Sequence, residues 1–177
     1  MQWLRFTVCA AGLLSAAIAV GQPAANRPAA APPLPCEVTV DQAGWNDPAP
    51  LAALAADRAD DPPMLRLGRA ATIALQPTPE MRYLLPPGQD GKADSFAGLV
   101  HFAVATAGDY RFLSSEDPWY DVIGGGGMLL PIARSHERDC IGAVRKMIDY
   151  KLSPGHYVLQ ISRTSTASLP LLLVKLP

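Results

Sequence analysis

Short apolar runs, separated by proline, glycine and aspartate, recur along the chain from residue 64 onward. Most have the length of one β-strand and are short for a helix. Tyr110 and Phe112 flank Arg111, the alternation of a strand that buries one face. The runs cover residues 64–76, 81–86, 98–105, 109–115, 119–123, 128–134, 146–152, 156–162 and 170–176. Together they predict a mainly β fold, a single antiparallel β-sandwich or jelly-roll.

The turn residues support the same fold. Pro154-Gly155 lies between two apolar runs and predicts a turn that joins two strands. Upstream, residues 50–58 have leucines at helical spacing after a proline suited to a first helical turn. We therefore predict one β-sandwich domain over residues 36–177, with a short N-terminal helix packed on it.

Residues 1–20 have the pattern of a secretory signal peptide. Arg5 precedes an uncharged apolar run that reaches the small residues of Ala17-Ile18-Ala19. Residues 21–35 are rich in proline and alanine, which build no core, and they predict a tether. The mature protein is therefore expected in the periplasm or outside the cell.

The charges limit the class of partner. The 15 basic residues nearly balance the 16 acidic residues, and no basic patch indicates nucleic-acid binding. After the signal peptide, no apolar run approaches the ~20 residues that cross a bilayer. We expect a mature chain without a transmembrane segment, which binds an envelope protein, a glycan or another envelope component.

Two cysteines, Cys36 and Cys140, follow the signal peptide. In an exported chain they predict a disulfide, for which the chain-entropy model gives ~4–5 kcal/mol at a loop of about 100 residues. Cys140 ends the stretch "SHERDC", so a metal ligand or a catalytic thiol is the alternative. A disulfide would exclude both, because each needs a free thiolate.

An acidic and aromatic stretch supplies the candidate binding residues, which are Asp117, Trp119, Tyr120 and Asp121. Trp119 and Tyr120 can offer flat faces to a ligand, and the carboxylates can hold a hard cation. The alternative is a turn followed by a strand that buries one aromatic ring. The glycines at 124–127 lack the Lys-Ser/Thr ending of a phosphate loop and predict a flexible inter-strand loop.

His101, His136 and Glu137 are the candidate metal ligands, because a non-haem iron site needs two histidines and one carboxylate. The chain has no H-x-H or C-x-x-C spacing that would place such ligands together locally. The charged residues Arg145, Lys146 and Asp149 are expected on a solvated strand face.

The stretches "AGDYRFLSSEDPWYDVI" and "LSPGHYVLQIS" resemble the pre-peptidase type of β-sandwich domain. The mature chain also resembles a small exported alphaproteobacterial family, whose members often carry the name homogentisate 1,2-dioxygenase. The shared features are Cys36, Gly44-Trp45, "LQPTPEMRY", "FAVATAGDYRFL", "SHERDC" and "VRKMIDYKL". Relatives have H-G-H before the late cysteine, whereas this chain has Ser135-His136-Glu137.

Two functions follow from these observations. The pre-peptidase resemblance implies a non-catalytic module without a cofactor, with a contact surface expected around Trp119, Tyr120 and residues 124–127. The dioxygenase name implies an enzyme with iron at His101, His136 and Glu137. A purely structural envelope protein is a third class that the sequence leaves open.

Overall fold

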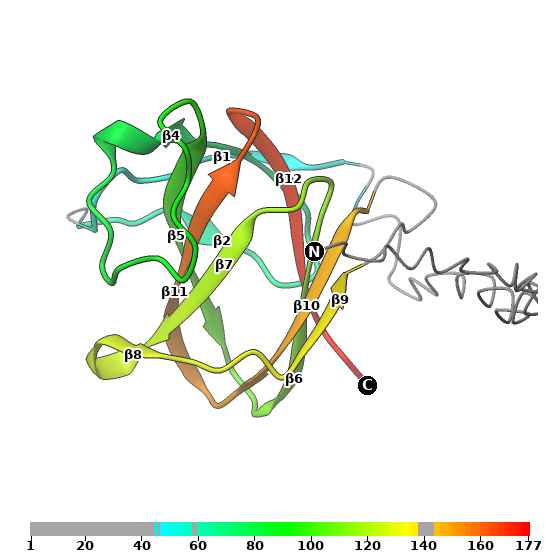
Figure 1. The fold of residues 1–177 in the computed structure, drawn as a ribbon. Helices are drawn as coiled ribbons and strands as arrows, with labels where there is room; N and C mark the ends of the chain where they lie inside the picture. Colours follow the sequence, from blue (N-terminus) through cyan, green and yellow to red (C-terminus); the bar gives the residue numbers. More distant parts are fainter. Residues whose placement is uncertain (1–44, 46, 58–59, 138–143) are drawn as a thin grey trace, which may run out of the picture. The chain divides into compact units, whose positions relative to one another are not determined.

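The computed structural model describes residues 45, 47–57, 60–137 and 144–177, and these form two β-sheets that face each other (Figure 1). The predicted signal peptide, the tether, Cys36 and Cys140 lie outside the described residues. The predicted β-sandwich is confirmed.

The first sheet has the strand order β1-β3-β12-β6-β10-β9. Its strands are β1 (Ala49–Ala52), β3 (Ala71–Ala74), β6 (Gly108–Ser114), β9 (Arg134–Glu137), β10 (Lys146–Leu152) and β12 (Ser168–Lys175). All its neighbours pair antiparallel except β1 and β3, which are parallel.

The second sheet has the order β2-β5-β11-β7-β8, and β4 pairs additionally with β5. Its strands are β2 (Met64–Leu65), β4 (Gln76–Pro77), β5 (Phe96–Val104), β7 (Trp119–Gly124), β8 (Met128–Leu129) and β11 (Gly155–Thr164). Two short 3₁₀ turns, η1 (Thr78–Glu80) and η2 (Gly125–Gly127), follow β4 and β7.

The connections give the fold its jelly-roll topology. Four strands of one sheet, β3-β12-β6-β10, face four strands of the other, β5-β11-β7-β8. Along these eight strands the chain changes sheet at every step except from β7 to β8, which are neighbours in one sheet. The Pro154-Gly155 turn joins two strands, as predicted, but β10 and β11 belong to different sheets. The turn is therefore an arch over the edge of the core and not a hairpin within one sheet.

Aromatic rings fill the space between the sheets. Phe112 meets Phe102 and Tyr150 edge to face, with ring centroids 5.4 and 5.9 Å apart, and lies 5.9 Å from the Tyr120 ring. Tyr157 stacks on Phe102 at 5.3 Å. Such pairs add to the large apolar area that each ring buries. The centre of the sandwich is thus a packed core.

Part of the outer face of the first sheet is also buried, which the alternation around Arg111 did not indicate. Leu113, Met147 and Leu172 form a second apolar cluster there. Within the same sheet, the Arg111 guanidinium donates two hydrogen bonds, of 2.7 and 2.9 Å, to the Asp149 carboxylate. These bonds raise the pKa of Arg111, and Asp149 is buried, so its predicted position on a solvated face is wrong.

The helix predicted over residues 50–58 is wrong for the described residues 50–57. Residues 49–52 form β1, and isolated bridges then join Leu54 to Leu99 and Ala56 to Arg82. A helix of two turns is marginal alone, whereas β1 gains a ladder with β3. Pro50 is tolerated because β1 is an edge strand. The strand predicted over 81–86 is also wrong, since only the bridge at Arg82 forms there among the described contacts.

Two buried tyrosines in this core differ in one hydrogen bond. The Tyr150 hydroxyl donates to the Tyr120 carbonyl oxygen at 3.1 Å, whereas the Tyr120 hydroxyl has no partner among the described residues. The nearby Ser114 hydroxyl donates to the Glu116 carbonyl at 3.0 Å, and it acts against the rise that burial causes in the pKa of Tyr120. Burial nevertheless raises the pKa of both tyrosines far above the usual 10.

We expect Tyr120→Phe to raise the free energy of unfolding at pH 7 by about 1 kcal/mol, because it removes an unpaired buried hydroxyl. Tyr150→Phe should lower it by about 1 kcal/mol, because it removes a hydrogen bond. Urea unfolding of the two variants and the wild type measures both changes. A loss of stability in Tyr120→Phe as large as in Tyr150→Phe would contradict the assignment.

The same variants report on alkaline stability. Above pH 10 the tyrosines ionise in the unfolded chain but stay protonated in the fold, so the unfolded state binds fewer protons. Stability present below pH 10 then falls by about 1.4 kcal/mol per pH unit for each buried tyrosine. Each Tyr→Phe variant should therefore lose less stability between pH 10 and 12 than the wild type does.

Candidate functional site

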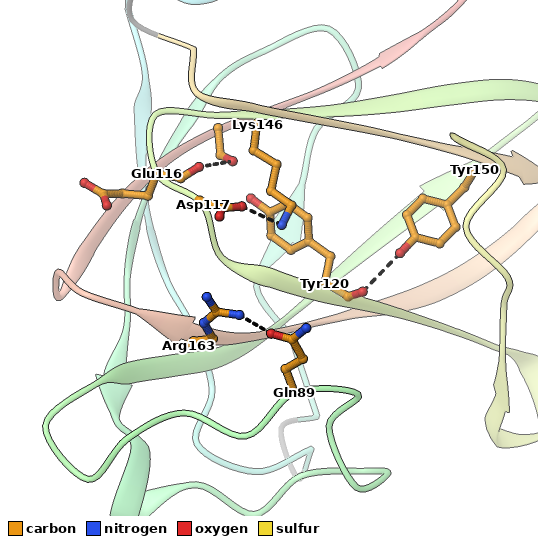
Figure 2. A network of polar contacts seen from close by, with 8 residues as sticks. Gln89, Glu116, Asp117, Tyr120, Lys146, Tyr150 and Arg163 are labelled. Carbon is orange, nitrogen blue, oxygen red and sulfur yellow. Dashed lines mark hydrogen bonds and ion pairs between the residues drawn. The ribbon is translucent and has the colours of Figure 1, made fainter. Parts of the chain in front are cut away.

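The predicted binding residues lie where the chain crosses from β6 to β7. Asp117 is on the crossing, and its side chain is 61% exposed. Its carboxylate accepts a hydrogen bond of 2.7 Å from Lys146 Nζ, and Lys146 is buried at the start of β10 (Figure 2). Asp117 therefore neutralises a buried ammonium group, and the solvated position predicted for Lys146 is wrong.

Asp121 is buried and organises its surroundings through its carboxylate. Oδ1 accepts a hydrogen bond of 2.9 Å from Trp119 Nε1. Oδ2 accepts bonds of 3.1 Å from the Gly88 N–H and 3.3 Å from Gln160 Nε2. Three donors on three parts of the chain thus converge on one carboxylate, which fixes their relative positions.

Residues 84–92, here called the covering segment, lie over the outer face of the second sheet. The Gln160 side chain accepts from the Leu84 N–H at 3.1 Å and donates to the Leu85 carbonyl at 3.1 Å. Gly88 lies against the Trp119 indole so closely that a Cβ would come within 2.6 Å of Nε1. The part of this outer face that carries Asp121 and Gln160 is therefore buried under chain and does not offer an open site.

Arg163 ties the covering segment to β11 from the other side. It is a non-glycine residue with a φ of 61°, at a bulge in the pairing of β11 with β5. Its guanidinium donates to the Gln89 side-chain oxygen (Figure 2), and the Ser162 hydroxyl donates to the Gln89 carbonyl at 3.0 Å. The bulge turns Arg163 toward the segment that it holds.

The predicted binding residues thus have different accessibilities. Tyr120 is buried in the core and Asp121 beneath the covering segment, so neither offers a surface to a partner. Trp119 is half-buried, and its indole N–H is bonded to Asp121. Asp117 is the exposed member of the four. Of the two aromatic residues in the contact surface expected from the sequence, Tyr120 is therefore inaccessible and Trp119 only partly accessible.

The glycine loop next to these residues carries an apolar surface. Gly126 and Gly127 have φ values of 76° and 75°, a conformation that favours glycine. Directly after them, Met128, Leu129 and Ile132 are 66%, 49% and 37% exposed. We call residues 125–132 the tip (Figure 1). The strand predicted over residues 128–134 did not indicate this exposure, although glycines precede the apolar residues and Pro131 interrupts them.

The tip also lies at a sheet edge. β8 pairs with β7 through Ile123–Leu129 and Gly124–Met128, and it ends the order of the second sheet within the described part of the chain. An edge strand leaves backbone groups free to pair with another chain. The tip thus combines exposed aliphatic side chains with an open strand edge.

The predicted iron ligands come from different sheets. His101 is on β5, and its Nε2 lies 2.9 Å from Asp57 Oδ1. His136 and Glu137 are on β9, opposite Met147 and Lys146, and their side chains lie outside the described part. Across residues 45, 47–57, 60–137 and 144–177, no cluster of three potential metal ligands is formed. The iron site stays a prediction.

Comparisons of the chain with protein-family models, curated proteins and solved structures gave no match. The family resemblances noted in the sequence therefore also stay predictions. Within the described segments, no helix has the length and apolar character needed to cross a membrane.

Proposed function

We propose that this protein is a non-catalytic binding module, which holds a partner protein of the cell envelope through the tip. The observation that carries the proposal is the exposure of Met128, Leu129 and Ile132 together beside a glycine turn. Contiguous exposed apolar groups on a folded domain mark interaction surfaces more often than isolated ones do.

The chemistry of the tip favours a protein over a glycan. Sugar rings are held mainly on flat aromatic faces and by hydrogen-bonding side chains, whereas the exposed groups here are aliphatic. Aliphatic side chains and methionine fit an apolar pocket of a partner protein, and the β8 edge can add backbone hydrogen bonds. A periplasmic or extracellular place for this contact follows from the predicted signal peptide.

The interior of the fold supports a surface function. Phe102, Phe112, Tyr120, Tyr150 and Tyr157 fill the space between the sheets, where larger barrels hold ligands. Binding on this scaffold is therefore expected on the outside of the sheets, at loops and edges.

The proposal is tested by a triple variant of the tip, Met128→Ser with Leu129→Ser and Ile132→Ser. We expect the wild-type protein, in an extract of its native host, to elute in size-exclusion chromatography as a complex larger than the purified chain. The tip variant should elute at the position of the free chain, because its apolar contact area is lost.

A matched control places serine at two exposed leucines elsewhere, Leu67→Ser with Leu84→Ser. The control should keep the larger complex. Elution of the tip variant with the wild-type complex, or loss of the complex in both variants, would contradict the proposal. Sedimentation of the wild type with lipid vesicles, abolished in the tip variant, would assign the tip to a membrane surface instead.

A further inference from the structure

A second feature, remote in sequence from the tip, is a groove of about 530 Å³ lined by residues next to β1 and β2. β1 ends the first sheet and β2 ends the second in the described strand order. Pro62, Pro63 and Met64 give the groove apolar walls, and Arg66 and Arg69 give it positive charge. Its volume lies in the range of small-molecule sites.

A tight turn brings the two arginines together. The Arg69 N–H bonds to the Arg66 carbonyl at 3.4 Å, and Gly68 between them has a φ of 77°, which glycine adopts without strain. The Gly68 N–H bonds to the Leu173 carbonyl at 2.8 Å, so the turn is anchored on β12. The ends of such a turn lie within about 7 Å of each other.

Both guanidinium groups are exposed and have no ion-pair or hydrogen-bond partner among the described residues. Among the described residues that line the groove, Asp61 is the acidic one, and the Pro62–Leu65 stretch separates it from Arg66. The groove therefore has more positive than negative charge, and its cations are gathered at one turn. Arginine forks suit the paired oxygens of a carboxylate or phosphate.

We propose that this groove binds an amphiphilic anion, with the oxyanion held between Arg66 and Arg69 and the apolar body against Pro62, Pro63 and Met64. The positive charge of the two arginines selects the anionic head group of such a ligand, and the apolar wall selects its hydrocarbon tail. The site does not depend on the tip, so it adds a small ligand to the protein partner of the proposed function.

The experiment is isothermal titration calorimetry with octyl phosphate and octanoate, each below its micelle concentration. We expect saturable binding of at least one of the two at one site, and the tighter ligand identifies the preferred head group. The variant Arg66→Gln/Arg69→Gln should weaken that binding about tenfold or more, because two charge-assisted contacts are lost. Arg82→Gln/Arg145→Gln, which removes two other exposed arginines, should bind as the wild type does.

Two further probes separate the contribution of the charged head group to binding from that of the hydrocarbon tail. Octyl glucoside, which has the tail without the charge, and inorganic phosphate, which has the charge without the tail, should each bind at least about tenfold more weakly than the preferred ligand. Absence of binding, equal binding by the Arg66/Arg69 variant, or equal binding of either probe would overturn the proposal. The tip variant should bind octyl phosphate and octanoate unchanged, so failure here is distinct from failure of the proposed function.

Discussion

Replacing Phe112 with alanine should lower the free energy of unfolding by about 3–5 kcal/mol, the range for a large ring removed from a packed core. The Phe112 side chain is fully buried and contacts the rings of Phe102, Tyr120 and Tyr150. The change removes all three ring contacts and leaves a cavity between the sheets. Denaturant unfolding followed by circular dichroism measures the loss.

Phe96→Ala is the matched control, because Phe96 lies at the start of β5 and packs on the core while only partly buried. Its loss should be less than half that of Phe112→Ala, since less area is removed from contact. Equal losses in the two variants would mean that the aromatic cluster is not the centre of the core.

The second large effect is expected at Asp121. Asp121→Asn keeps the shape of the side chain but removes the charge and replaces one acceptor oxygen with a donor. Trp119 Nε1, the Gly88 N–H and Gln160 Nε2 cannot all then be satisfied. We expect a loss of about 2–4 kcal/mol in the free energy of unfolding, because buried donors to a charged acceptor are left unpaired.

Amide hydrogen exchange distinguishes this account from a general loss of stability. In Asp121→Asn, exchange at Gly88 should accelerate more than exchange at core amides such as that of Phe102. Asp109→Asn is the control, since Asp109 forms an exposed ion pair with Lys151 and such pairs contribute little. Protection of Gly88 as strong in Asp121→Asn as in Asp109→Asn would show that Asp121 does not hold the covering segment.

The strands were predictable because a short run that alternates apolar and polar residues can bury its apolar side chains together on one face of a strand, as a two-layer fold requires. Eight of the nine predicted runs contain a strand, and Tyr110 and Phe112 face the core as their alternation predicted. The predictions that were wrong concern single segments of the chain. The 81–86 run pairs little because the N–H of Leu84, within the run, donates to the Gln160 side chain, and residues from Leu84 onward belong to the covering segment.

The site was less predictable, because the sequence pattern of β7 does not show that the covering segment buries the outer face of this strand. Asp121 and Tyr120 have residue types that suit a binding surface, yet contacts with residues 33 or more positions away bury Asp121, and ring packing buries Tyr120. The exposure of Met128 and Leu129 beside the expected 124–127 surface was not predicted for the opposite reason, since both have the residue type of the core. Tertiary contacts decided both outcomes.

The proposed function is tested most directly by photo-crosslinking in the native host, with p-benzoylphenylalanine placed at position 128. We expect one discrete adduct with a protein when the crosslinker is at position 128, and none when it replaces Leu84, which is also exposed, at 40% against 66% for Met128. No adduct at position 128, or the same adduct from both positions, would contradict the tip as the contact surface.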